Sequence, residues 1–349
     1  MSLHQPLSLK RGPAWPNHFA LAPMTNCQSH SDGTLSDDEL HWLAMRAQGG
    51  FGLTMTCASH VQAIGQGFPG QLGCWDDRHI PGLTRVADAI RAAGSVSSIQ
   101  LHHAGYRSPR ELIGGPAVAP SDDAESGAVG LTLDGVHELR ESFIAAAIRA
   151  EKAGFDGVQL HGAHSYILCA FLSPETNRRE DEYGDRARLL WEILRGIREQ
   201  CRPDFQVGVR LSPDGYGLIP GEMLSLAEEL MTSGLIDHLD ISLWDWKKLD
   251  ESGQRVLDLY SALDRGETRL GAAGKILSGI DAQACLDAGL DFVSIGRSAI
   301  LHHDWPRILA QNPAAEPREL PVHAETLRQE GLGEAFIAYM RRWKGFVAD

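Results

Sequence analysis

Short apolar runs alternate with longer amphipathic segments along most of this chain, and this alternation is the feature that most limits its fold. The short runs are rich in Val, Ile and Leu, as in buried parallel strands, whereas intervening segments such as DDELHWLAMRAQ have helical periodicity. Eight strands are expected, at residues 18–24, 51–59, 95–102, 157–162, 206–211, 238–243, 274–278 and 291–295. Strand followed by helix, eight times, predicts an α/β fold closed into a (β/α)8 TIM barrel. A doubly wound open sheet is the alternative.

The regular repeat favours one domain. A chain of 349 residues has room for two average domains or one large barrel, and the repeat places a barrel at about 17–310. The stretch QNPAAEPRELP then breaks the pattern, and HAETLRQEGLGEAFIAYMRRW is expected to form one further helix. We therefore interpret 311–349 as a C-terminal helical extension. Two long polar connections, at 60–77 and 107–134, are expected to wall the active site, because β-to-α loops gather at one face of a barrel.

Charge and cysteine content limit the partners. The chain has 32 Lys and Arg against 46 Asp and Glu, a net charge of -14, which disfavours nucleic acid and anionic membranes as partners. No apolar run approaches the roughly 20 residues that span a bilayer, so we expect a cytoplasmic protein. Small molecules are the expected partners, and a homo-oligomer is possible. The six cysteines include no CxxC pair, which argues against a metal cluster or disulfide framework. Only Cys27 is kept open as a reactive thiol.

Polar residues and glycines stand at the ends of the expected strands, where a barrel builds its site. The set is Thr25, Ala58, Gln100, His102, His161, His164, Arg210, Gly279, Gly296 and Arg297. A glycine after strand seven and a Gly-Arg pair after strand eight predict a phosphate site. Arg210 needs a counter-charge from the protein or from a ligand, because an unpaired buried cation is costly. Gln100 suits the polar edge of a heterocycle, although a core glutamine would look the same.

The stretch HGAHSYILCAFLSPETNRREDEYG places His161, His164 and Tyr166 close together. Three interpretations of the two histidines stay open. A metal site is weakly supported, because catalytic zinc normally takes three protein ligands and no third is suitably spaced. Two hydrogen-bonded core histidines are the ordinary case. The third interpretation is a pair of donors to one oxygen that gains negative charge, with Tyr166 as a proton donor at neutral pH.

These motifs resemble those of the Old Yellow Enzyme family of FMN-dependent ene-reductases, over roughly 17–308. The most specific match is the HxxHxY stretch with the FLSP and DEYG segments that follow it. LAPMT, LGCWDDRHIPGL, IQLHHAG, VGVRLSP and SIGR match in the family's order. The resemblance implies a TIM barrel that binds FMN and receives hydride from NAD(P)H. No GxGxxG follows a strand, so NAD(P)H would visit the flavin face itself instead of a Rossmann domain.

The resemblance also implies roles for individual residues. Those expected to bind FMN are Ala22, Pro23, Met24, Thr25, Ala58, Gln100, Arg210, Gly279, Gly296 and Arg297. His161 and His164 would hold the carbonyl oxygen of an activated alkene, and Tyr166 would protonate its α carbon after hydride reaches the β carbon. The substrates implied are α,β-unsaturated carbonyl compounds, such as enones, and nitroalkenes. No metal is implied.

The chain departs from the family pattern at several positions. Thr25 stands where close bacterial relatives carry a cysteine, Cys27 where they carry a tyrosine, and Tyr106 where an arginine is usual. None of these removes a proposed catalytic group. Two alternatives remain: a flavoprotein of the same fold with another redox reaction, such as demethylation or redox sensing, and a metal-dependent barrel hydrolase.

Overall fold

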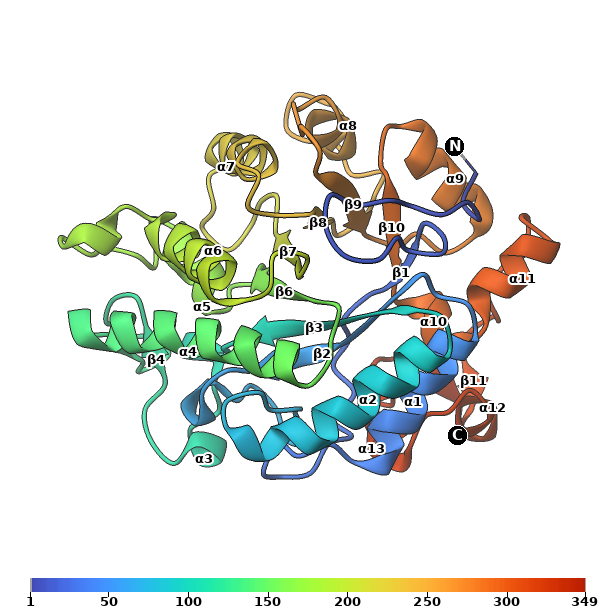
Figure 1. The fold of residues 1–349 in the computed structure, drawn as a ribbon, viewed down its shortest axis with the longest axis horizontal. Helices are drawn as coiled ribbons and strands as arrows, with labels where there is room; N and C mark the ends of the chain where they lie inside the picture. Colours follow the sequence, from blue (N-terminus) through green and yellow to red (C-terminus); the bar gives the residue numbers. More distant parts are fainter. Residues whose placement is uncertain (1, 349) are drawn as a thin grey trace.

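Eight parallel strands close into a barrel in the computed structural model, which describes residues 2–348 (Figure 1). The strands follow one another around the barrel in the order β1-β10-β9-β8-β7-β6-β3-β2. Their bounds are β1 Phe19–Leu21, β2 Leu53–His60, β3 Val96–His102, β6 Gly157–Gly162, β7 Gln206–Leu211, β8 His238–Ser242, β9 Arg269–Ala273 and β10 Phe292–Ile295. The closed order confirms the expected (β/α)8 barrel and is incompatible with an open sheet.

The position expected for the seventh strand is wrong. We predicted residues 274–278, whereas the strand is Arg269–Ala273, paired along its length with β8. Its sequence, RLGAA, lacks the β-branched residues that signal a strand, but the small residues fit because Gly271 packs directly under the ring of Phe292. The apolar residues after it form a loop that ends in the capping box of Ser278 and Asp281.

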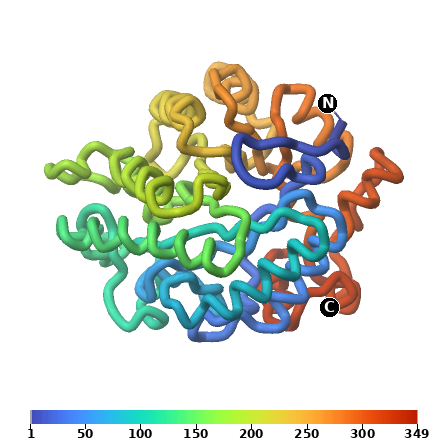
Figure 2. The backbone as a smooth tube through the Cα atoms, viewed as in Figure 1, coloured from blue at the N-terminus to red at the C-terminus, as the bar shows by residue number. Residues whose placement is uncertain are grey.

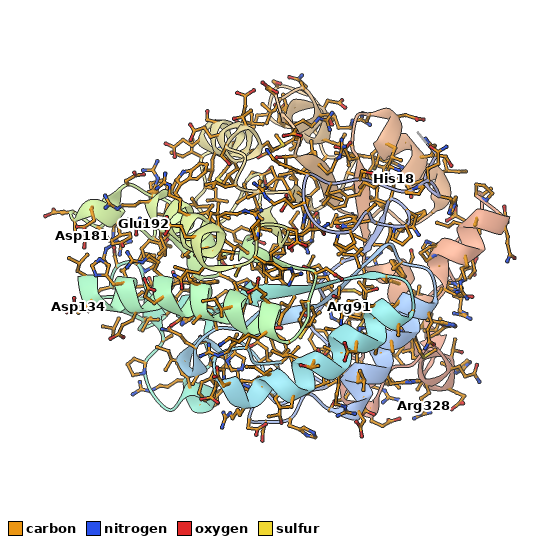
Figure 3. All side chains as sticks on the ribbon, viewed as in Figure 1. His18, Arg91, Asp134, Asp181, Glu192 and Arg328 are labelled. Carbon is orange, nitrogen blue, oxygen red and sulfur yellow. The ribbon has the colours of Figure 1, made fainter. Side chains whose placement is uncertain are left out.

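Helices cover the outside of the barrel. The main ones are α1 Asp37–Gln48, α2 Ile80–Ala92, α4 Leu133–Lys152, α6 Arg188–Gln200, α7 Pro220–Thr232, α8 Val256–Ser261, α9 Gly279–Asp287 and α10 Arg297–Leu301. Shorter elements decorate the connections: α3 Arg110–Ile113, α5 Ile167–Leu172, α11 Trp305–Gln311, β4 Val118–Ala119 and β5 Val129–Gly130. Apolar helix faces meet the barrel in one large core, and charged side chains such as Asp134, Asp181 and Arg328 lie at the periphery (Figure 3).

The N-terminal segment closes one end of the barrel. Leu7 and Trp15 form an antiparallel bridge, and the fully buried Trp15 packs edge-on against Phe292, at the start of β10. Its indole Nε1 donates to Oε1 of Gln206, the first residue of β7. Because this plug sits where the strands begin, we expect a ligand to enter where the strands end, which is the face that carries the candidate site residues.

The C-terminal extension packs against α1 beside the barrel (Figure 2). The single helix expected there is two helices, α12 Ala324–Gln329 and α13 Glu334–Met340, because Gly331 adopts a left-handed φ of 82° between them. Phe336 packs edge-on against Trp42 of α1, with ring centroids 4.9 Å apart. Two short strands, β11 Val322–His323 and β12 Val347–Ala348, pair within the extension. Its last helix is thereby fixed against the barrel wall.

Candidate active site

The three candidate catalytic residues meet at the end of β6. His161 is the penultimate residue of this strand, and Tyr166 precedes α5 as its N-cap residue. The ring of His161 lies 5.2 Å from that of His164 and 5.0 Å from that of Tyr166, measured between centroids. The structure therefore brings together the cluster expected from the HxxHxY spacing.

The loop that carries His164 has an unusual backbone. His164 and Ser165 both adopt left-handed conformations, with φ values of 61° and 59°, which non-glycine residues rarely keep without support from their surroundings. The Oγ of Ser212 accepts a hydrogen bond from the His164 backbone N–H at 3.0 Å, and Arg107 Nη1 donates to the backbone carbonyl of His164 at 2.8 Å. These bonds hold the imidazole above the end of the barrel.

Arg210 finds its counter-charge in the protein. It pairs in register with His161 on one side and with Asp240 on the other. Its Nε lies 3.6 Å from the Asp240 carboxylate, and both side chains are almost completely buried. Within residues 2–348 the Nε–H has no hydrogen-bond partner, and Arg210 Nη2 donates to Ser242 Oγ at 3.2 Å. A buried guanidinium with an unpaired donor suits an acceptor group on a ligand.

Both histidines are neutral at physiological pH. Burial, together with the nearby Arg210 and Arg107 cations, lowers the pKa of His164 to about 3. Burial, followed by His164 and His102, lowers the pKa of His161 well below its ordinary value. A neutral imidazole donates from one nitrogen and accepts at the other, so the pair acts through hydrogen bonds and not as fixed charges.

Two further residues, neither of which the motifs assign to the reaction, contact Tyr166. His102, at the end of β3, packs edge-on against the Tyr166 ring at a centroid distance of 4.3 Å. Neither of its ring nitrogens has a partner among the described residues. The Arg107 guanidinium carbon lies 4.8 Å above the Tyr166 ring. The strand-end position of His102 is a signal that sequence alone provides, whereas the contact of Arg107 depends on the fold of its loop.

Residues at the ends of β2 and β3 lie side by side in the barrel interior. Ala58 and Gln100 are register partners across these strands. The fully buried Gln100 donates from Nε2 to Oε1 of Gln159 at 2.8 Å. One of the two amide hydrogens of Gln100 is therefore bonded within the protein, as in an ordinary core glutamine.

A cavity of about 430 Å³ adjoins the ends of β1 and β10. Met24, Thr25 and Arg297 line it, so three of the expected flavin-binding residues share one hollow. Ala22 and Pro23 directly precede them, and Gly296 faces Met24 and Ala22, since a Cβ built on it would lie 3.5 Å from the Met24 sulfur and 3.9 Å from the Ala22 Cβ. The β1 and β10 residues therefore form one contiguous surface.

Gly279 lies apart from that surface. It is the first residue of α9, and a Cβ there would clash with the carbonyl oxygen of Pro313. The residues that directly follow β9 are Gly274 and Lys275, both with positive φ, 155° and 51°. The sequence did not indicate this pair, because the apolar residues after Gly274 predict a strand there. Gly274 occupies the strand-end position that we had attributed to Gly279.

The C-terminal helix also reaches the cavity, which the sequence did not indicate. Tyr339 and Trp343 line it together with Thr25. Cys27 lies nearby with a left-handed φ of 57°. Burial raises the pKa of the Cys27 thiol to about 11, so it is protonated at neutral pH and is a poor nucleophile.

The donor set fits FMN. The flavin ring has carbonyl and ring-nitrogen acceptors along one edge, which match the unpaired Nε–H of Arg210 and the amide of Gln100. The phosphate is a dianion, for which the guanidinium of Arg297 is a suitable partner, and this side chain lines the cavity beside Met24 and Thr25. A barrel with these features belongs to the class of flavin-dependent oxidoreductases.

Within residues 2–348, no group of three or more His, Cys, Asp or Glu residues is arranged to hold a metal ion.

Sequence comparison identifies the family within that class. Residues 2–316 match the model of the NADH:flavin oxidoreductase / NADH oxidase family, and the chain belongs to this family, which is the Old Yellow Enzyme family recognised from the motifs. The match extends to residue 2 and so includes the N-terminal plug of the barrel.

Individual relatives agree with this assignment. A probable NADH-dependent flavin oxidoreductase, YqiG of Bacillus subtilis, is 36% identical over 87% of this chain and 86% of its own length. The old yellow enzyme homologue of Zymomonas mobilis has a TM-score of 0.79 at 28% identity, covering 94% of this chain and 96% of its own. Morphinone reductase in complex with tetrahydroNAD has a TM-score of 0.80 at 26% identity, covering 100% and 98%. Some relatives are much longer proteins, of which this chain spans only 33% and 37%.

The family assignment decides between an FMN-dependent oxidoreductase and a metal-dependent hydrolase. It confirms the resemblance, the TIM barrel, and an NAD(P)H-dependent oxidoreductase with FMN as its cofactor. The hydrolase alternative is wrong.

None of the helices described between residues 2 and 348 is long and apolar enough to cross a membrane.

Proposed function

We propose that this enzyme reduces the activated C=C bond of α,β-unsaturated carbonyl or nitro compounds. The observation that carries the proposal is the pair of neutral imidazoles, His161 and His164, set beside the Tyr166 ring at the open end of the barrel. Two neutral donors suit an oxygen that gains negative charge during the reaction, and a phenol is a suitable proton source at neutral pH.

Each residue of the site has a separate role in the proposed reaction. FMN, when bound, supplies the hydride that NAD(P)H has delivered to it. His161 and His164 hold the carbonyl or nitro oxygen, which polarises the double bond and orients the β carbon. Tyr166 gives a proton to the α carbon, and Arg107, above its ring, and His102, at its edge, fix the ring in place.

The proposal extends to the cofactor contacts. Ala22, Pro23, Met24, Thr25, Ala58, Gln100 and Arg210 would contact the flavin ring, and Gly296 and Arg297 would hold the phosphate. Gly279 stays a prediction for the phosphate, and Gly274 is added as the glycine at the end of β9. The support for these assignments is the shared surface formed by the ends of β1 and β10 and the cavity beside it.

An anaerobic substrate screen tests the proposal. The FMN-loaded enzyme is reduced with NADH or NADPH and then mixed with cyclohexenone-type enones, nitroalkenes and saturated controls, while flavin reoxidation is followed by absorbance. We expect rapid reoxidation by the activated alkenes and formation of the saturated products. Reoxidation by oxygen alone, with no alkene consumed, would favour a different redox reaction on the same fold.

A further inference from the structure

A single hydroxyl connects the histidine pair with the buried arginine. Ser242 is the last residue of β8 and is half-buried. Its Oγ lies 2.6 Å from His164 Nε2 and 3.2 Å from Arg210 Nη2. Because side chains two residues apart on a strand share a face, Ser242 stands directly above Asp240, the partner of Arg210. Two strands, β7 and β8, and the loop after β6 thus meet at this serine.

The arginine leaves the hydrogen of the serine hydroxyl free to bond to His164. A guanidinium can only donate, so Ser242 Oγ accepts from Arg210 and its own hydrogen is free for His164. The His164 ring is neutral at pH 7, since burial and two neighbouring cations lower its pKa to about 3, and it therefore carries one proton. If Nε2 accepts the serine hydrogen, that proton resides on Nδ1.

We propose that Ser242 is a positioning residue that holds His164 in the Nδ1–H tautomer, so that His164 donates to the substrate oxygen from Nδ1. This inference rests on the proposed function, in which His164 holds a carbonyl or nitro oxygen. With Nε2 occupied at 2.6 Å, Nδ1 is the only ring nitrogen left for the substrate. The opposite tautomer presents a lone pair there, which repels the oxygen it should hold.

The same arrangement connects substrate binding to the flavin side of the site. Arg210 orients the serine, the serine orients the imidazole, and the imidazole holds the substrate oxygen. Asp240 keeps the guanidinium in place from below, at 3.6 Å. A change at Ser242 is therefore expected to affect the reaction with alkenes much more than the binding of FMN, because Arg210 keeps Asp240 as a partner.

The tautomer is measured directly by two-bond ¹H–¹⁵N correlation spectra of the FMN-loaded protein containing ¹⁵N-labelled histidine, without substrate. The His164 signals are assigned by their loss in His164→Gln. We expect the proton on Nδ1 in the wild type, a mixture or an Nε2–H form in Ser242→Ala, and recovery of the Nδ1–H form in Ser242→Thr, which restores the hydroxyl.

Kinetics and a matched control complete the test. Reoxidation by an enone should slow on the order of tenfold in Ser242→Ala, less than the roughly 10²-fold expected for losing a donor outright, and Ser242→Thr should recover most of the rate. Ser212→Ala removes another hydroxyl bonded to His164, but through its backbone N–H. This control should keep the Nδ1–H tautomer even if the loop shifts.

Two results would overturn the inference: an Nε2–H ring in the wild type, or an unchanged tautomer and rate in Ser242→Ala. The wild-type spectrum decides the first even if Ser242→Ala does not fold. The failure of the proposed function has a different signature, since a wild-type enzyme that reduces no alkene refutes that proposal whatever the tautomer is.

Discussion

Replacing Tyr166 by phenylalanine separates proton delivery from hydride delivery. The ring makes three contacts that phenylalanine keeps: the edge of His102 at 4.3 Å, His161 at 5.0 Å and the Arg107 guanidinium at 4.8 Å. The substitution removes only the hydroxyl, so the free energy of unfolding should change by less than about 1.5 kcal/mol, as for volume-conserving changes. FMN content should stay at the wild-type level.

The effect on the reaction depends on the substrate. Reduction of an enone requires a proton at the α carbon, and general acid assistance typically contributes about 10²- to 10⁴-fold in rate, which corresponds to about 2.7 to 5.4 kcal/mol of activation free energy. A nitroalkene yields a nitronate that is stable enough to leave without this proton. Tyr166→Phe should therefore be slowed with enones but keep nearly normal hydride transfer to nitroalkenes.

Stopped-flow absorbance under anaerobic conditions measures both outcomes. Flavin reoxidation is followed after mixing the reduced variant with 2-cyclohexenone or with a nitroalkene, and the nitronate is followed in the ultraviolet. We expect slow reoxidation by the enone and an accumulating nitronate. A Tyr166→Phe enzyme that reduces enones at the wild-type rate would refute the assignment of Tyr166 as the acid, because solvent or another group would then supply the proton.

Three other predictions address the histidines, the phosphate and the response to acid. His161→Ala and His164→Ala should each slow reoxidation by enones by about 10²-fold and slow flavin reduction by NAD(P)H much less; equal losses in both stopped-flow half-reactions would indicate a structural role instead. Arg297→Ala should purify largely without FMN, whereas Arg297→Lys should keep part of it, and a fully yellow Arg297→Ala protein would show that the phosphate binds elsewhere. Burial lowers the pKa of His60 to about 4 and that of His103 to about 3, so these rings are neutral in the folded protein and protonate near pH 6.5 when unfolded. Stability should therefore fall as the pH drops from about 6.5 towards 4, and melting temperatures across this range check it, with His103→Asn expected to show a weaker dependence.

Local sequence determined the parts of the site that lie on one stretch of chain. His161, His164 and Tyr166 are separated by few residues, so the end of one strand and the loop after it place all three in the same part of the site. The fold class was also readable from sequence, because strand and helix periodicities are local properties of the chain. Strand β9 was misplaced because its Leu, Gly and Ala residues pack well in the barrel but carry no local strand signal.

Only the tertiary structure decided which residues surround that motif. Ser242 contacts His164, and Asp240 contacts Arg210, because β7 pairs with both β6 and β8. Tyr339 reaches Thr25 from more than 300 residues away, because the C-terminal extension folds back along α1. The sequence specifies each of these side chains, but their pairing follows from strand register and helix packing, which depend on contacts distributed over the whole core. The order of residues along the chain therefore determined the catalytic motif, and strand register and helix packing determined the contacts that hold it in place.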